Sequence, residues 1–145
     1  MGTISSIPRW TESYNGIPFT TTGFNHAGCH CWGLVRLVLG EQRGLWLPTY
    51  GEISARELAA IARTLRIEKL AAAWSRVEAW QPFDVVLMAG RLGASGRRAE
   101  LHCAVAVSAD HLLHVEEATA SVCVRRDHPS VRFRIIETYR HASLT

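Results

Sequence analysis

The sequence is poor in lysine, in long apolar runs and in repeats. Lysine occurs once, so that arginine supplies nearly all of the 16 basic residues, and the arginines are scattered along the chain. A net charge of +3 in this form does not indicate a nucleic-acid partner, and we expect none, although a preference for an anionic polymer stays open. No apolar run approaches the roughly 18 residues of a membrane span. We therefore expect no membrane span.

The first ten residues lack a basic stretch followed by an apolar core, so we expect no secretory signal and expect the chain to fold in the cytoplasm. Hydrophobic residues make up 48% of the 145 residues, which suits one packed core and a single domain over residues 1–145. Residues 1–28 are rich in Thr, Ser, Gly and Asn and predict an extended segment. Its expected anchors to the core are Trp10, Tyr14, Ile17, Pro18 and Phe19.

Helical patterns fill the first half of the chain. Apolar residues at helical spacing predict a buried helix from about His30 to Gly40 or Gly44. A turn over residues 47–51 should follow, and then a second helical region over residues 54–77. Ser54 and Glu57 fit a capping box at its start, and a break near residues 66–67 would leave a further helix carrying Leu70 and Trp74.

Strand patterns fill the second half. After a strand over residues 83–89 and a flexible loop over residues 90–99, residues 101–107 and 111–116 predict a hairpin around residues 108–110. Strands over residues 121–126 and 131–139 would complete an antiparallel sheet. Helices first and strands second favour an α+β fold, with N-terminal helices packed on a C-terminal antiparallel sheet.

Cys31 is the candidate nucleophile because it stands at the predicted start of a buried helix. Unpaired N–H groups and the positive end of the helix dipole favour thiolate over thiol there, and the same N–H groups can bind an oxyanion. Gly33 allows another segment to approach closely. The alternative is a buried cysteine that simply packs beside Trp32.

His102 is the candidate base, at the head of the strand over residues 101–107. Alternation places Ala104 and Ala106 on its face, and we expect these small residues to leave room for the helix. His114, on the partner strand, should come level with residues 104–106 and could bond the second nitrogen of His102. Glu116 competes for that role, and an ordinary strand-end histidine is the alternative for His102.

The four cysteines allow other interpretations. Disulfides are not expected, since nothing else indicates secretion. A zinc site of Cys29, His30, Cys31, His102 and Cys103 stays open, but its spacing differs from the usual cysteine knuckles, and we expect no metal. Cys103 and Cys123 lie in apolar alternating runs and are interpreted as small buried hydrophobic residues.

Several segments together resemble the NlpC/p60 superfamily of bacterial cell-wall cysteine peptidases, in the version found in phage tail-tip proteins and gene-transfer agents. Residues 28–35, GCHCWGLV, resemble its nucleophile motif. The other matching segments are 47–50 (LPTY), 81–86 (QPFDVV), 102–107 (HCAVAV), 112–116 (LLHVE) and 137–141 (ETYRH). The resemblance implies a minimal papain-like fold with catalytic Cys31, His102 and His114, and no cofactor.

It also implies hydrolysis of peptide bonds in peptidoglycan stem peptides, with phage tail proteins as further partners and action in the virion tail, periplasm or cell wall. Tyr14 and Trp32 are expected to bind substrate. One departure is His30, where the family usually has Asp; His is expected to cap the helix poorly, and Cys29 could draw Cys31 into a mixed redox state. The alternatives are an inactive tail-assembly component, or an amidase or transferase acting on another amide.

Overall fold

The computed structural model describes residues 7–21, 23–47, 74–89, 102–117 and 119–144. In chain order, its elements are η1 (Arg9–Tyr14), β1 (Phe24–Asn25), β2 (Gly28–Cys29), α1 (Cys31–Arg43), β3 (Trp74–Val77), β4 (Val85–Met88), β5 (His102–Ala106), β6 (His111–Glu116), β7 (Thr119–Arg125), β8 (Ile135–His141) and η3 (Ala142–Leu144).

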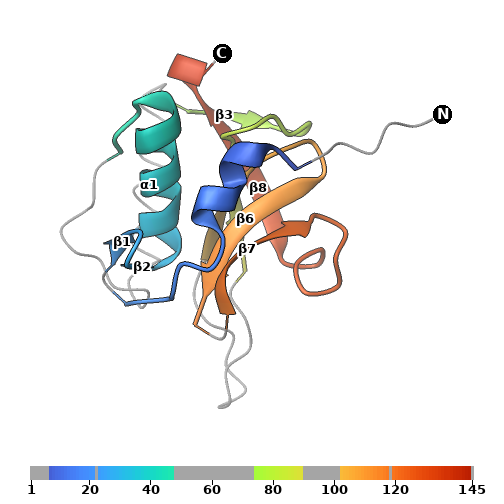
Figure 1. The fold of residues 1–145 in the computed structure, drawn as a ribbon. Helices are drawn as coiled ribbons and strands as arrows, with labels where there is room; N and C mark the ends of the chain where they lie inside the picture. Colours follow the sequence, from blue (N-terminus) through green and yellow to red (C-terminus); the bar gives the residue numbers. More distant parts are fainter. Residues whose placement is uncertain (1–6, 22, 48–73, 90–101, 118, 145) are drawn as a thin grey trace.

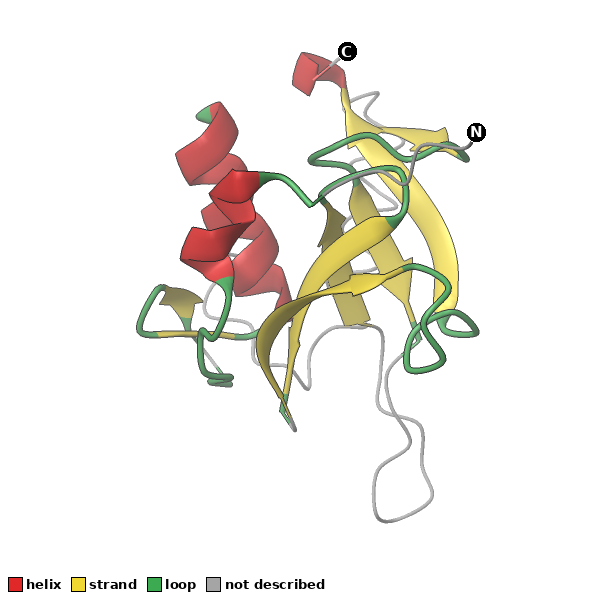
Figure 2. Ribbon diagram, turned by 45° about the vertical axis from the view of Figure 1, so that its right-hand side comes forward, coloured by secondary structure: helices red, strands yellow, loops and turns green. Residues whose placement is uncertain are grey.

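One main helix packs on one face of an antiparallel sheet, as Figures 1 and 2 show. The six strands follow the order β3-β8-β4-β5-β6-β7, and β1 and β2 form a separate pair beside the start of α1. The predicted α+β class and antiparallel sheet are confirmed. Within the described parts of the chain, no helix is long and apolar enough to cross a membrane.

Helix α1 begins and ends where its sequence predicts. Its apolar residues are buried against the sheet, and Gly44 ends it in the left-handed region, at φ 67°, with its N–H bonded to Gly40 O at 3.0 Å. The start of the helix packs tightly against Gly23 and the first residue of β1. A Cβ at Gly33 would collide with the carbonyl of Gly23 and with Phe24, so only glycine fits there. This close approach places the first turn of α1.

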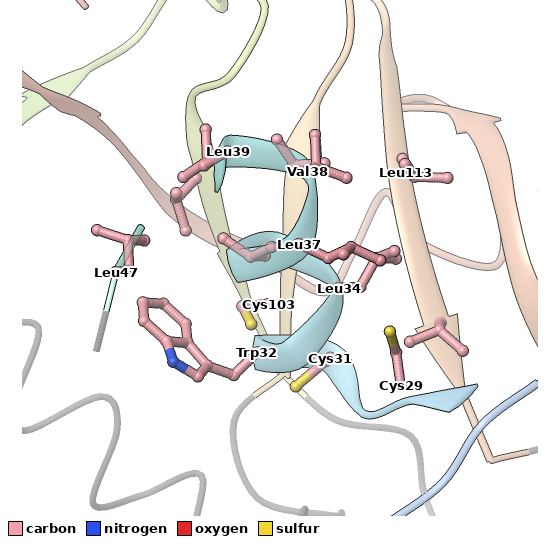
Figure 3. Packing of buried hydrophobic residues seen from close by; sticks show 14 of the residues in the cluster. Cys29, Cys31, Trp32, Leu34, Leu37, Val38, Leu39, Leu47, Cys103 and Leu113 are labelled. Carbon is pink, nitrogen blue, oxygen red and sulfur yellow. The ribbon is translucent and has the colours of Figure 1, made fainter. Parts of the chain in front are cut away.

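Strand β5 separates two clusters of buried side chains. Cys103, Val105 and Val107 join the cluster that contains the apolar face of α1, part of which Figure 3 shows. Ala104 and Ala106 join a second cluster on the other side. The predicted alternation is confirmed, but the expectation that the alanines make room for the helix is wrong, since α1 packs on the opposite side of β5. The second cluster consists of Trp80, Val86, Met88, Ala104, Ala106, Leu112 and Val131.

The hairpin of β5 and β6 forms as predicted. Val105 pairs with Leu113 and Ala106 with Leu112, and Val107 N–H bonds His111 O at 3.0 Å across the turn. Continuing this register places His114 opposite residue 104. Strand β4 pairs with β5 on the other side, so that β5 is central in the sheet.

Two predicted elements are wrong. Residues 74–77 form strand β3 instead of a helix, because they pair with β8, Trp74 opposite His141, and helical spacing carries no information about such a distant partner. Strand β8 begins at Ile135 instead of Val131, because Val131 and Arg134 form a turn in which Arg134 N–H bonds Val131 O at 2.9 Å.

The N-terminal segment is more regular than predicted. It contains η1, β1 and β2, and Tyr14 and Ile17 are buried anchors. Trp10 and Phe19 pack partly buried against the same cluster, whereas Pro18 is exposed and that expectation is wrong. The predicted turn over 47–51 (beyond Leu47), the helix over 54–73 and the loop over 90–99 lie outside the described residues.

A buried ion pair joins the loop before β4 to β8. The Asp84 side chain is 0% exposed, and its two oxygens accept hydrogen bonds from Arg140 Nε and Nη2, both at 2.8 Å. One oxygen also accepts the backbone N–H of Gln81 at 2.8 Å. Fully bonded in this way, the carboxylate can stay charged inside the protein.

We predict that Asp84→Ala lowers the free energy of unfolding by about 3–5 kcal/mol, because it leaves the largely buried charge of Arg140 without its partner. The measurement is urea denaturation followed by circular dichroism. The matched control is Asp127→Ala, which breaks the exposed pair with Arg125 and should change stability little. Equal effects of the two substitutions would contradict the prediction.

Candidate active site

Cys31 and His102 are the first residues of α1 and β5, and these two element starts meet. The Cys31 side chain is 2% exposed and forms hydrogen bonds with His102 and with Cys103. Burial alone would raise the pKa of the Cys31 thiol. Hydrogen bonds with the Cys103 side chain, the His102 ring and the Cys103 backbone, together with the charge of His102, outweigh it and hold the pKa of Cys31 well below its usual value. The structure therefore favours a thiolate at Cys31.

Cys103 shares this environment but keeps its proton. Its hydrogen bond with Cys31, together with burial and the negative charge on Cys31, raises its pKa well above the usual value. Figure 3 shows both sulfurs at the first turn of α1. Cys103 therefore acts as a thiol donor beside the Cys31 sulfur, a role that its apolar sequence context did not indicate. The only signal was its position directly after His102.

A second histidine holds the ring of His102. His102 Nε2 lies 2.9 Å from His114 Nδ1 in a buried hydrogen bond, and the ring centroids are 5.2 Å apart at 64°. Because Nε2 is directed at His114, Nδ1 is the nitrogen of His102 left to face Cys31. The structure thus brings the three predicted residues together in one connected line.

Glu116 continues this line beyond His114. Its Oε1 lies 3.6 Å from His114 Nδ1, and Arg134 donates to its two oxygens at 3.0 and 2.8 Å. Burial alone would raise the pKa of Glu116. The hydrogen bonds from Arg134 and the charges of His102, Arg134 and His114 lower it instead, so Glu116 is ionised. His114, not Glu116, makes the hydrogen bond to His102.

Of the residues that the structure describes, His102, His114 and Glu116 have the donor atoms best grouped for a metal ion, all within 4.8 Å of one another. Two features disfavour that use. The facing ring nitrogens of the two histidines are joined by a hydrogen bond, so one of them carries the proton and the lone pair of the other accepts it, and both are engaged away from a metal. The Glu116 carboxylate is also already paired with the positive charge of Arg134, which would repel a metal cation. The arrangement suits the carriage of a proton better than the ligation of a metal.

The zinc set considered from the sequence does not assemble around one point. The Cys29 thiol donates to the backbone carbonyl of Asn25 at 3.1 Å, and His30 Nδ1 accepts from a backbone N–H. Burial raises the pKa of Cys29 to about 12, so it stays a thiol. In Figure 3 its side chain lies away from that of Cys31.

His30 caps α1, which corrects the expectation that it caps poorly. Its backbone is extended, and Nδ1 accepts the N–H of Gly33 at 3.0 Å, as an Asp oxygen would. Burial lowers the pKa of His30 below its ordinary 6.5, and the nearby Cys31 charge opposes that shift. A neutral ring is what the cap requires, because only an unprotonated nitrogen can accept the bond.

Tyr14 and Trp32 are core residues in this structure, each 1% exposed. The Tyr14 hydroxyl donates to Glu41 Oε1 at 3.0 Å and accepts from Gln42 Nε2 at 3.0 Å. Trp32 points beside the first turn of α1 toward Leu47 (Figure 3). Substrate contact by either ring stays a prediction.

Comparison with solved structures gives a clear likeness of fold. The chain superposes on the crystal structure of the NlpC/p60 domain of the peptidoglycan hydrolase SagA with a TM-score of 0.56 and 16% sequence identity. The match covers 90% of this chain and 92% of that one. This protein therefore has the papain-like fold of the NlpC/p60 domains. Its sequence matches no family model and no curated protein sequence.

We predict that His30→Asn makes folding less sensitive to acid. Because the pKa of His30 is lowered on folding, its contribution to stability is present above about pH 6.5 and is lost as the pH falls, while Asn caps without titrating. Thermal unfolding at about pH 7.5 and about pH 5 should show a smaller fall in Tm for the variant. An equal fall in both proteins would contradict the role of His30.

We also predict that iodoacetamide modifies Cys31 before the other cysteines at about pH 6.5, because only its pKa is lowered. Peptide mapping by mass spectrometry after short exposures gives the order of labelling. Protein unfolded in guanidinium is the control, in which all four thiols should react at similar rates. Earlier labelling of Cys29 or of the half-buried Cys123 would refute the assignment.

Proposed function

We propose that this protein is a cysteine peptidase that hydrolyses peptide bonds in peptidoglycan stem peptides, and that residues 1–145 form one catalytic domain. The catalytic residues would be Cys31, His102 and His114. One observation carries the proposal: a thiol with a lowered pKa, at the start of a helix, is bonded to a histidine whose other ring nitrogen is held by a second histidine.

In the proposed reaction, the Cys31 thiolate attacks a peptide carbonyl carbon, and the backbone N–H of Cys31 helps to bind the oxyanion. His102, which carries a proton on Nδ1, gives it to the leaving amine as the C–N bond breaks. His102 then takes a proton from water, which attacks the acyl-enzyme and releases the Cys31 thiolate. His114 keeps the His102 ring aligned through both steps.

The substrate class is inferred from two likenesses. SagA, whose NlpC/p60 domain shares this fold, is a peptidoglycan hydrolase, and the sequence motifs resemble the phage tail-tip members of the same superfamily. Together they favour cell-wall stem peptides as substrate, the virion tail as location and phage tail proteins as partners. The same three residues would also serve an amidase or transferase, because the class of amide is decided by the binding surface.

A second candidate is a tail-assembly component that keeps the fold without catalysis. The observation in its favour is the 2% exposure of Cys31, since a substrate carbonyl must reach that sulfur. The two candidates differ in one measurable property, the release of new amino groups from peptidoglycan.

We predict that purified protein releases amines from peptidoglycan and that Cys31→Ala lowers the rate by about a thousandfold or more, because no other group forms the acyl-enzyme. Mass spectrometry of the products, against a panel of other amides, identifies the bond. Cys29→Ala is the matched control and should keep most of the activity. Undiminished hydrolysis by Cys31→Ala would exclude the mechanism, and no release by the unaltered protein would favour the tail component.

A further inference from the structure

The side chain of Arg134, in the turn before β8, is held by four hydrogen bonds. Besides its two bonds to Glu116, it donates to Ala89 O at 2.9 Å and to Ser130 O at 3.0 Å. These contacts tie the end of β4, the turn before β8 and the end of β6 together around one carboxylate. Both side chains of the pair are nearly buried, with 12% and 11% exposed. A pair of this kind is costly to desolvate and is weak evidence of a gain in stability.

The pair lies against the two histidines of the candidate active site. Glu116 Oε1 is 3.6 Å from His114 Nδ1, the same nitrogen that faces His102 Nε2 at 2.9 Å. At 3.6 Å the carboxylate is too far from that nitrogen for a good hydrogen bond. It acts instead through its charge, which is screened little in a buried site.

The Glu116 charge can act on the one extra proton that the His102–His114 pair can hold. When His102 is protonated, its Nε2–H donates to His114 Nδ1, so His114 is neutral and accepts at that atom. If the proton moves to His114, Nδ1–H donates back. In either case the histidine pair carries one positive charge, a few ångströms from Glu116.

We propose that Glu116, held by Arg134, is a positioning residue that keeps the His102–His114 pair protonated and so keeps Cys31 as thiolate. The proposal rests on the proposed function and deepens it. Charge then alternates along a buried line, negative at Cys31, positive on the histidines, negative at Glu116 and positive at Arg134. Without Arg134, burial would favour a protonated Glu116, and the charge would be lost.

Other titratable groups also affect the charges of the histidine pair and of Cys31. Among the described residues, Glu116 on β6 interacts with the histidine pair and with Arg134 before β8, while His30 at the start of α1 and Cys103 on β5 interact with Cys31. His30 is neutral in its cap and Cys103 keeps its proton, so Glu116 supplies the negative charge on the side of the pair away from Cys31.

The test is the pH dependence of Cys31 alkylation by iodoacetamide in Glu116→Gln. We expect labelling at about pH 7 to be up to about tenfold slower, because without the Glu116 charge the histidine pair binds its proton less tightly and the proton passes to the Cys31 thiolate, leaving an unreactive thiol. The matched control is Glu117→Gln, the same change at the exposed next residue, which should leave the profile unaltered. An unchanged profile in folded Glu116→Gln would overturn the proposal.

A second measurement needs no variant. NMR of the unaltered protein with isotope-labelled histidine should show His102 and His114 sharing one extra proton at about pH 7, and two neutral rings there would overturn the proposal even if Glu116→Gln failed to fold. Neither readout uses a substrate. Slower labelling of Glu116→Gln without amine release by the unaltered protein would keep this inference and reject the peptidase, while hydrolysis with an unchanged labelling profile would do the reverse.

Discussion

The site depends on the contact between the first residue of a helix and the first residue of a strand. A thiolate can be buried at Cys31 only because His102, Cys103 and the helix start compensate its charge. The position of the helix start in turn requires Gly33, where the chain of β1 passes too closely for a side chain. A small backbone constraint therefore determines whether the sulfur and the imidazole can meet.

The buried polar groups of this protein are arranged by charge. Asp84, just before β4, is matched by Arg140 on β8, and Glu116, at the end of β6, is matched by Arg134 in the turn before β8. The first pair joins the loop before β4 to β8, and none of its hydrogen bonds involves a histidine. The second lies within a few ångströms of them. Similar chemistry thus serves the fold in one place and the candidate site in the other.

Likeness of fold and argument for function rest on different residues. A superposition at 16% identity shows that the helix and sheet are arranged as in a distant hydrolase domain, which buried apolar patterns alone can preserve. The proposed chemistry comes instead from a few polar contacts around Cys31. The neutral cap provided by His30 belongs to these contacts, since its Nδ1 accepts the N–H of Gly33 at the start of the helix that carries Cys31.

The sequence alone determined the elements whose signals are local. Helix α1 with its glycine stop, the β5–β6 hairpin and the joint appearance of Cys31, His102 and His114 followed from periodicity, turn residues and motif order. Tertiary structure decided what depends on distant partners. Strand β3 exists because β8 offers an edge, α1 packs on the Cys103 side of β5, and Glu116 gains its charge partner from a turn 18 residues away. Such pairings depend on the spatial order of the strands, which no local pattern encodes.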